Sequence, residues 1–338
     1  MRDAVGMGMN RKKLKWNLYD KRYQFRDFYF HKAIRRHFFE KYINKDPYLP
    51  FYANRWVVGM KKTNQWIAEK IKSGSPFMVA RFGNTELAVM TSILQMRLFG
   101  STPESNARFH EWFDRMTEGA GFFPHDLGLG EKFVDLMLDV CKEVDMLAIF
   151  HCYMDDYVIT EYMKETRVTF LNHIEPWRCK TPWTAALKGK KVLVIHPFEE
   201  SIKEQYAKRN LLFPNGNVLP EFELKTLKAV QTIAGEKDER FGTWFEALEY
   251  MYREALKIKF DVAIIGCGAY GFPLAAKLKR AGKQVIHMGG ATQILFGIKG
   301  RRWVDNPRAG INFNDAWVYP KDSETPKNSG VVENHCYW

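Results

Sequence analysis

The chain of 338 residues has no long apolar run, and no stretch without a charged residue exceeds fifteen positions. One such stretch, residues 262–276, is interrupted by three glycines and a proline. A membrane-spanning helix needs about 20 consecutive apolar residues, so no transmembrane helix is expected. The first residues also lack the apolar stretch of a signal peptide, and export by that route is not expected.

Cysteine is scarce and scattered along the chain. The five cysteines are an odd number and form no CxxC pair, which argues against a disulfide framework and against a zinc ribbon; they are Cys141, Cys152, Cys179, Cys267 and Cys336. A reducing, cytoplasmic compartment is the simplest interpretation. With 46% hydrophobic and 27% charged residues, the composition is typical of a folded globular protein.

Acidic residues are few in the first 45 positions, where thirteen lysines and arginines are set against four carboxylates. This basic leader carries +9 of the total charge of +12, so the remaining 293 residues carry only +3. A nearly neutral body does not favour a broad surface for nucleic acid, and no nucleic-acid partner is expected.

The basic leader also holds ten aromatic residues, several of them three or four positions apart as on one face of a helix. Three interpretations stay open. The aromatic face packs on the domain behind it, or it lies on an anionic membrane surface as a peripheral contact through residues 1–45, or it forms an RNA-binding arm. The aromatic residues are Trp16, Tyr19, Tyr23, Phe25, Phe28, Tyr29, Phe30, Phe38, Phe39 and Tyr42.

Beyond residue 50, short apolar strands alternate with amphipathic helices. This alternation predicts an α/β fold, with a Rossmann-like, mostly parallel sheet covered by helices on both faces. A basic, aromatic-rich helical extension at 1–50, one domain at 51–320 and a loosely held tail at 321–338 are expected. Strands are predicted at 77–80, 146–150, 168–171, 191–196, 261–265 and 284–288, and helices at 61–72, 85–97, 105–116, 131–143, 199–209, 244–257 and 273–280, while 218–233 fits either.

A GxGxxG pattern at Gly266, Gly268 and Gly271 follows a predicted strand and opens a helix. Glycines there allow the backbone to approach a phosphate group, and a helix N-terminus supplies free N–H donors. A dinucleotide site also needs an acid at the end of the next strand, but that strand ends in His287 and Met288. The missing acid weakens an NAD(P) site and favours another nucleotide.

A second glycine turn, at Gly289 and Gly290, ends the neighbouring strand. It is followed by Lys299, Arg301 and Arg302, which could neutralise a diphosphate. Two glycine turns at the carboxyl ends of adjacent strands would present their N–H groups to the same ligand. An ordinary basic loop is the alternative interpretation.

Acid and base candidates also follow the predicted strands. Glu86 lies one turn into the helix after the first predicted strand, where it could accept a proton or hold a divalent metal. His196 and Glu199 follow another strand and are further acid or base candidates. Asp155 and Asp156 form a weaker pair, because most loop carboxylates are simply solvated.

Three segments resemble GT-D-type glycosyltransferases, a family of polysaccharide-biosynthesis enzymes with a Rossmann-like domain. They are RFGNTEL at 81–87, LVIHPFEESIKEQY at 193–206 and GCGAYGFPLAAKLKRAGKQVIHMGGATQILFGIKGRRW at 266–303. The resemblance implies a nucleotide diphosphate sugar as donor and an Asp-x-Glu motif that serves metal and nucleotide. Glu86 matches the Glu of that motif, but Asn84 stands in place of the Asp, which puts binding of Mn²⁺ or Mg²⁺ in question.

We therefore predict a glycosyltransferase that moves a sugar from a nucleotide diphosphate sugar to a hydroxyl of a glycan or lipid-linked acceptor. An NAD(P)-dependent oxidoreductase and a non-catalytic membrane or nucleic-acid adaptor are the alternatives. The catalytic candidates are Glu86, Glu199 and His196, with Glu86 also the candidate metal ligand. The predicted nucleotide-binding residues are Arg81, Gly83, Gly266, Gly268, Tyr270, Gly271, Gly289, Gly290, Thr292, Gln293, Lys299, Arg301 and Arg302.

Overall fold

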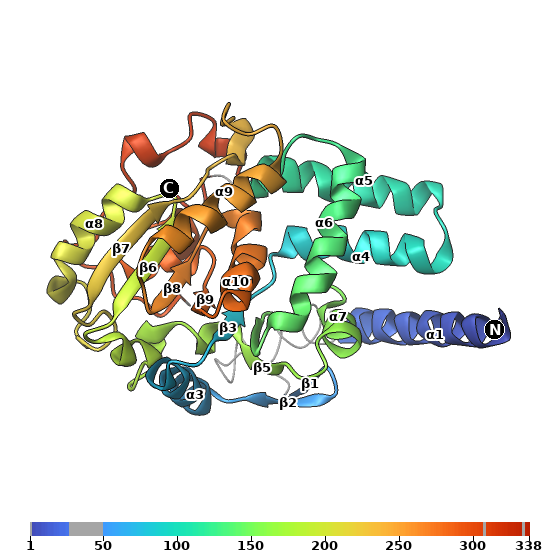
Figure 1. Ribbon diagram of the computed structural model, residues 1–338, viewed down its shortest axis with the longest axis horizontal. Helices are drawn as coiled ribbons and strands as arrows, with labels where there is room; N and C mark the ends of the chain where they lie inside the picture. The colour runs from blue at the N-terminus through green and yellow to red at the C-terminus, as the bar shows by residue number, and fades with distance from the viewer. Residues whose placement is uncertain (1, 27–49, 307–308, 333–334) are drawn as a thin grey trace.

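The computed structural model describes residues 2–26, 50–306, 309–332 and 335–338 (Figure 1). The leader's aromatic residues from Phe28 to Tyr42 lie outside these ranges. No helix within them is long and apolar enough to cross a bilayer, as the sequence predicts.

Within the described residues, nine strands form one sheet in the order β1-β2-β5-β4-β3-β9-β8-β6-β7. Every neighbouring pair is parallel except β1 and β2. The strands are β1 Phe51–Tyr52, β2 Arg55–Val58, β3 Phe77–Ala80, β4 Met146–Ile149, β5 Arg167–Phe170, β6 Lys191–His196, β7 Glu223–Lys228, β8 Val262–Ile265 and β9 Gln284–His287.

Helices cover both faces of the sheet. Successive strand residues point to opposite faces, so a strand that is apolar throughout has side chains to bury on each of them. Met78 and Ala80 of β3 enter one hydrophobic core, and Phe77 and Val79 enter the other. The first core packs under α4 Asn84–Phe99, α5 Pro103–Ala120, α6 Leu127–Val140, α7 Asp155–Tyr162, α9 Trp244–Lys257 and α10 Gly271–Arg280; the second packs under α3 Met60–Ser73, α8 Glu199–Ala207, α11 Ala291–Leu295 and α12 Arg301–Val304 (Figure 1).

The α/β class and the mostly parallel sheet are confirmed. The ambiguous stretch 218–233 contains strand β7, whereas β1 and β2 were not expected. Both are short, and most of their residues are at least partly exposed, so they lack a buried apolar signature. The Rossmann-like part of the prediction is not confirmed, since β9, and not β6, lies beside β3. This order departs from the 3-2-1-4-5-6 order of dinucleotide-binding sheets.

The N-terminal extension begins with helix α1, Arg2–Arg26, which lies beside α4 and α7 (Figure 1). Trp16 and Tyr19 are buried, and the Trp16 ring meets the edge of Tyr157 at 4.8 Å between centroids. Lys15 forms an ion pair of 2.7 Å with Glu161 of α7. For these two aromatic residues, the interpretation that the leader packs on the body is therefore confirmed.

The described part of the tail is not loosely held, so that prediction is wrong. Glu324 is 2% exposed, and its carboxylate accepts hydrogen bonds from the backbone amides of Glu200 at 2.8 Å and Ser201 at 3.2 Å. These amides lie in the first turn of α8, where the helix dipole stabilises a negative charge. Val332 and Cys336 are also buried, so the tail is fixed at several points.

Candidate functional site at the carboxyl edge of the sheet

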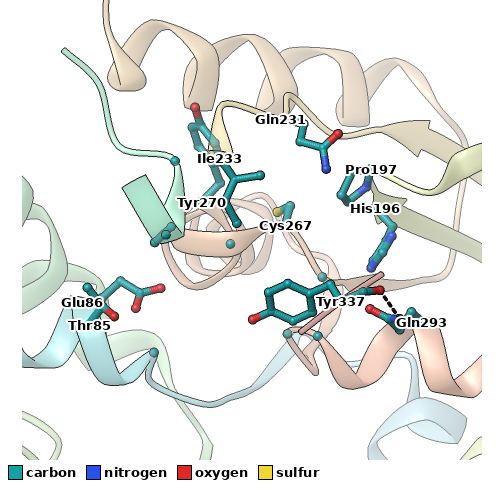
Figure 2. Close-up of a pocket in the computed structure, with 18 of the residues that line it drawn as sticks. Thr85, Glu86, His196, Pro197, Gln231, Ile233, Cys267, Tyr270, Gln293 and Tyr337 are labelled. Atoms are coloured by element: carbon teal, nitrogen blue, oxygen red, sulfur yellow. Dashed lines mark hydrogen bonds between the residues drawn. The ribbon is translucent and has the colours of Figure 1, made fainter. Parts of the chain in front are cut away.

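A cavity of about 470 Å³ lies at the carboxyl ends of seven strands (Figure 2). The segments that follow β3, β9, β8, β6 and β7 contribute to its lining, as do Phe150 after β4 and Leu171 after β5. On one side of the β3–β9 boundary the chain proceeds to β4 and β5, and on the other lie β8, β6 and β7. Open parallel sheets bind ligands at such a switch in strand order.

The two glycine turns lie against each other in this cavity, as the sequence predicts. A Cβ on Gly266 would stand 2.5 Å from the carbonyl oxygen of Gly289 and 2.8 Å from the His196 ring. Gly268 and Gly289 both have positive φ, +55° and +61°, a conformation that glycine adopts without strain. Gly290, by contrast, is covered by the Tyr337 ring, which a Cβ there would approach to 2.6 Å.

Two arginines, one from each side of the β3–β9 boundary, line the cavity. Arg81 follows β3, and its guanidinium lies 4.9 Å from the centre of the Phe150 ring. Arg302 of α12 lies 4.9 Å from the Tyr337 ring and donates a hydrogen bond of 3.3 Å to the Tyr337 hydroxyl. Both guanidinium groups are therefore held in place by aromatic neighbours.

The other two predicted cations do not line the cavity. Lys299 lies over the Tyr319 ring, with its Nζ 5.7 Å from the ring centre. Arg301 is exposed and pairs with Asp305 at 3.2 Å, one helical turn along α12. Since neighbouring residues of a short helix point in different directions, only Arg302 of the basic cluster faces the site.

Glu86 supplies the one carboxylate among the described residues that line the cavity. It stands in the first turn of α4, and its carboxyl group folds back over Gly83, where a Cβ would collide with it. Burial raises the pKa of Glu86 above its usual value, while its own backbone amide and Arg81 act in the opposite direction. A raised pKa brings a carboxylate closer to the strength that a general base needs near neutral pH.

The donor set does not fit a divalent cation held by the protein alone. Such a cation takes about six oxygen ligands, carboxylates foremost, and Glu86 is the one side-chain carboxylate of the described lining, beside neutral oxygens such as those of Asn84 and Gln293. No group of three or more His, Cys, Asp or Glu residues with metal-binding geometry occurs in the described ranges. The role of Glu86 as a metal ligand stays a prediction, and Arg81 and Arg302 are the arginines of the described lining.

His196 is present in the cavity, but not as the acid or base that the sequence suggests. Its Nδ1 accepts a hydrogen bond of 3.0 Å from the Phe198 amide, which leaves the ring proton on Nε2 of the neutral ring. Burial lowers the pKa of His196 to about 3. A neutral ring with this tautomer donates a hydrogen bond and does not take up a proton near pH 7.

Acid stability tests this assignment. The unfolded chain protonates His196 below about pH 6.5, and the folded chain only near pH 3. The free energy of unfolding therefore falls as the pH drops through this window. His196→Asn, whose side-chain oxygen can keep the Phe198 hydrogen bond, is expected to lessen that fall by up to about 1.4 kcal/mol per pH unit. Denaturant titrations between pH 4 and 6.5 measure the free energy of unfolding at each pH. His110→Asn, at an exposed position, is the control. If the free energy of unfolding changes with pH equally in the wild type and in His196→Asn, the assignment is wrong.

Three lining residues each carry a buried polar atom without a hydrogen-bond partner: His287 Nδ1, Gln293 Oε1 and Trp338 Nε1. Gln293 is otherwise tied down, because its Nε2 donates to the carbonyl oxygens of Lys299 at 2.8 Å and Tyr337 at 3.0 Å (Figure 2). Unpaired buried polar atoms cost free energy, and their clustering in one cavity is typical of a ligand site.

Three further predicted residues lie outside the lining. The Glu199 carboxylate accepts hydrogen bonds from Lys203 at 2.8 Å and Thr226 at 2.6 Å. Thr292 donates to the Ile265 carbonyl at 3.3 Å and is fully buried, and Gly271 allows the close approach of the His287 ring. Their visible contacts serve packing. The predicted residues that do line the cavity are Arg81, Gly83, Glu86, His196, Gly266, Gly268, Tyr270, Gly289, Gly290, Gln293 and Arg302.

Sequence reasoning missed three segments that complete the lining of the cavity. Residues 119–121 at the end of α5, residues 231–233 after β7, and Tyr337 and Trp338 of the tail all contribute to the lining. Thr232 joins two of these parts, since its hydroxyl donates to the Gly121 carbonyl at 2.6 Å and lies 3.0 Å from the Tyr270 hydroxyl. Only the three-dimensional fold brings these distant segments together.

Fold and cavity together define an α/β protein with a cavity at the carboxyl edge of its sheet, lined by two arginines and a buried glutamate. No protein-family model matches the chain, and no curated protein matches it. Three solved structures are similar over 79 to 80% of this chain and 95 to 96% of theirs, at 12 to 14% identity. Two are of the domain of unknown function 1792, one of them described as having a distinct glycosyltransferase fold; the third is described as a new glycosyltransferase (DUF1792) from Streptococcus sanguinis. At TM-scores of 0.39 to 0.40, these similarities do not fix the activity of this chain.

Proposed function

We propose that the protein is a glycosyltransferase of GT-D type that moves a sugar from a nucleotide diphosphate sugar to a hydroxyl group of a glycan or lipid-linked acceptor. The observation that carries the proposal is the pair of adjoining glycine turns at Gly266 and Gly289, flanked by Arg81 and Arg302, with Glu86 lining the same cavity. The turns and arginines could bind a diphosphate, and the carboxylate could accept the proton of an attacking hydroxyl group.

The donor's diphosphate would bind where the two glycine turns meet. The guanidinium groups of Arg81 and Arg302 are donors that phosphate oxygens prefer. The amides of Gly266 and Gly289 already donate to carbonyl oxygens of β6 and β8, so these glycines would serve by allowing close approach of the ligand to the backbone. His196 adds a neutral N–H from its Nε2, in keeping with its tautomer. These groups would stabilise the negative charge that develops on the diphosphate as it leaves.

In the transfer step, the acceptor's oxygen forms a bond to the anomeric carbon of the sugar. The bond between that carbon and the phosphate oxygen breaks, and its electron pair leaves with the nucleoside diphosphate. The acceptor's proton passes to the Glu86 carboxylate, so that atoms and charge balance. General-base catalysis of this kind contributes about 10²- to 10⁴-fold to a rate.

The proposed role lies in glycan or polysaccharide assembly in the cytoplasm. Helix α1 exposes Leu14 and Leu18 beside its lysines and arginines. Exposed apolar and basic side chains on one helix suit a peripheral contact with an anionic membrane. We include that contact in the proposal, independently of the buried Trp16 and Tyr19.

Ligand-induced stabilisation tests the donor site. A nucleoside diphosphate at 100 times its dissociation constant is expected to add about 2.7 kcal/mol to the free energy of unfolding. UDP, GDP, ADP and CDP would be compared by thermal unfolding, each with EDTA and with added Mn²⁺. Because the protein's own residues supply the positive charge, we expect the stabilisation to persist in EDTA.

NAD(P)H serves as the comparison ligand in the same assay. No stabilisation by it is expected, since the strand order departs from the dinucleotide-binding order and β9 ends in His287, with no acid there. Stabilisation by NAD(P)H alone would favour the oxidoreductase alternative. Stabilisation by no nucleotide would refute the proposed function.

A further inference from the structure

A second cavity, of about 330 Å³, adjoins the first and has a different character. Its walls come from α1, α4, α5 and residues 150–153 after β4. Tyr23, Trp112, Phe150 and Tyr153 supply four aromatic rings, and Arg108 supplies a cation. None of its described lining residues is a glycine or a carboxylate, so it lacks the features that suit the first cavity to a diphosphate and a general base.

The two cavities share a wall. Asn84 and Phe150 line both of them. Arg81 stacks on Phe150 from the side of the first cavity. Glu86 stands two positions after Asn84 in α4, and residues two apart on a helix point in different directions, so its carboxylate lines the first cavity and not the second. A molecule in the second cavity would therefore lie beside the first, with Asn84 and Phe150 at the boundary.

The aromatic side chains of the second cavity are held in place by one another and by cations. The rings of Tyr23 and Tyr153 meet edge to face at 5.0 Å, and the Arg108 guanidinium lies 4.3 Å from the Tyr153 ring centre. The guanidinium of Arg115 lies 4.7 Å from the Trp112 ring centre. Aromatic rings fixed in this way present rigid apolar faces with polar edges.

We infer that the second cavity binds a sugar ring of the acceptor glycan; the inference rests on the proposed function. A pyranose ring has an apolar C–H face that packs on an indole, and hydroxyl groups at its rim that accept hydrogen bonds from a guanidinium. Trp112 supplies the indole and Arg108 the guanidinium. The reacting hydroxyl of the acceptor would have to extend past Asn84 and Phe150 to reach Glu86 in the first cavity. Helix α1, through Tyr23, thereby belongs to the acceptor site.

A glycan array tests the inference with the full chain. The wild type is expected to bind a subset of immobilised oligosaccharides, and Trp112→Ala is expected to lose about tenfold in affinity for them, or about 1.4 kcal/mol. Trp112→Phe, which keeps an aromatic face, should retain most of the binding. Trp56→Ala is the matched control, because Trp56 is 73% exposed on β2 and lies outside both cavities.

Nucleoside diphosphate stabilisation is measured on every variant in parallel. It is expected to be unchanged in Trp112→Ala, which also shows that the variant is folded; if Trp112→Ala does not fold, Arg108→Gln replaces it. A wild type that binds no glycan, or an unchanged glycan profile in the tested variant, would overturn the inference. Absence of nucleotide stabilisation in the wild type would instead overturn the proposed function, so the two failures are distinguishable.

Discussion

Glu86→Gln is expected to lower the rate of sugar transfer by about 10²- to 10⁴-fold while leaving nucleoside diphosphate binding nearly unchanged. The amide keeps the shape of the carboxyl group but cannot accept the acceptor's proton. Because burial already opposes the charge of Glu86, a neutral amide should not destabilise the fold. Steady-state transfer assays and thermal unfolding with a nucleoside diphosphate measure the two effects separately.

Glu199→Gln is the matched control for this experiment. The substitution is the same, but Glu199 lies outside the cavity and interacts with Lys203 and Thr226. Transfer by this variant should stay within about threefold of the wild type, since surface pairs of this kind contribute about 1 kcal/mol or less. Unchanged transfer by Glu86→Gln would remove Glu86 from the mechanism. A large loss of transfer in Glu199→Gln would instead show that Glu199 takes part in the reaction.

The second large effect is expected for Gly266→Ala, at the contact between the two glycine turns. The new methyl group would stand 2.5 Å from the Gly289 carbonyl oxygen and 2.7 Å from the Thr292 hydroxyl, so the turns must separate. Overpacking of this kind costs about 1 to 3 kcal/mol. Nucleoside diphosphate affinity should fall at least about tenfold, which isothermal titration would measure.

Gly216→Ala offers the control for a methyl group added where there is space. Nothing lies within 4 Å of a Cβ at Gly216, and this residue does not line the cavity. Its stability and nucleotide affinity should match those of the wild type. Equal nucleotide affinity in Gly266→Ala and Gly216→Ala would show that the diphosphate does not bind where the glycine turns meet.

The sequence was most informative where the physics is local. Buried strands such as β6 and β8 are continuous apolar runs, and a glycine turn after such a run must lie at the carboxyl edge of the sheet. For that reason the contact between Gly266 and Gly289 could be predicted without coordinates.

Side-chain direction and long-range packing could not be predicted in the same way. Arg301 and Arg302 are neighbours in sequence, yet only Arg302 faces the cavity. The tautomer of His196 depends on one backbone amide two residues away, and its neutral state depends on burial by the fold. Tyr337 and Trp338 line the site, where Gln293 donates to the Tyr337 carbonyl and the Arg302 amide to the Cys336 carbonyl; these contacts join positions more than 30 apart, and no local pattern encodes them.

Helix α1 contacts the body mainly through α4 and α7 and contributes no strand to the sheet. If its Tyr23 forms one wall of the acceptor cavity, the sequence of this helix could be replaced to change the acceptor cavity while the sheet and the first cavity stay intact. Chimeras that carry another sequence at residues 2–26, with Trp16 and Tyr19 kept as anchors, would alter which glycans are elongated without disturbing how the activated sugar is held. Acceptor choice could then diversify among related enzymes faster than donor chemistry.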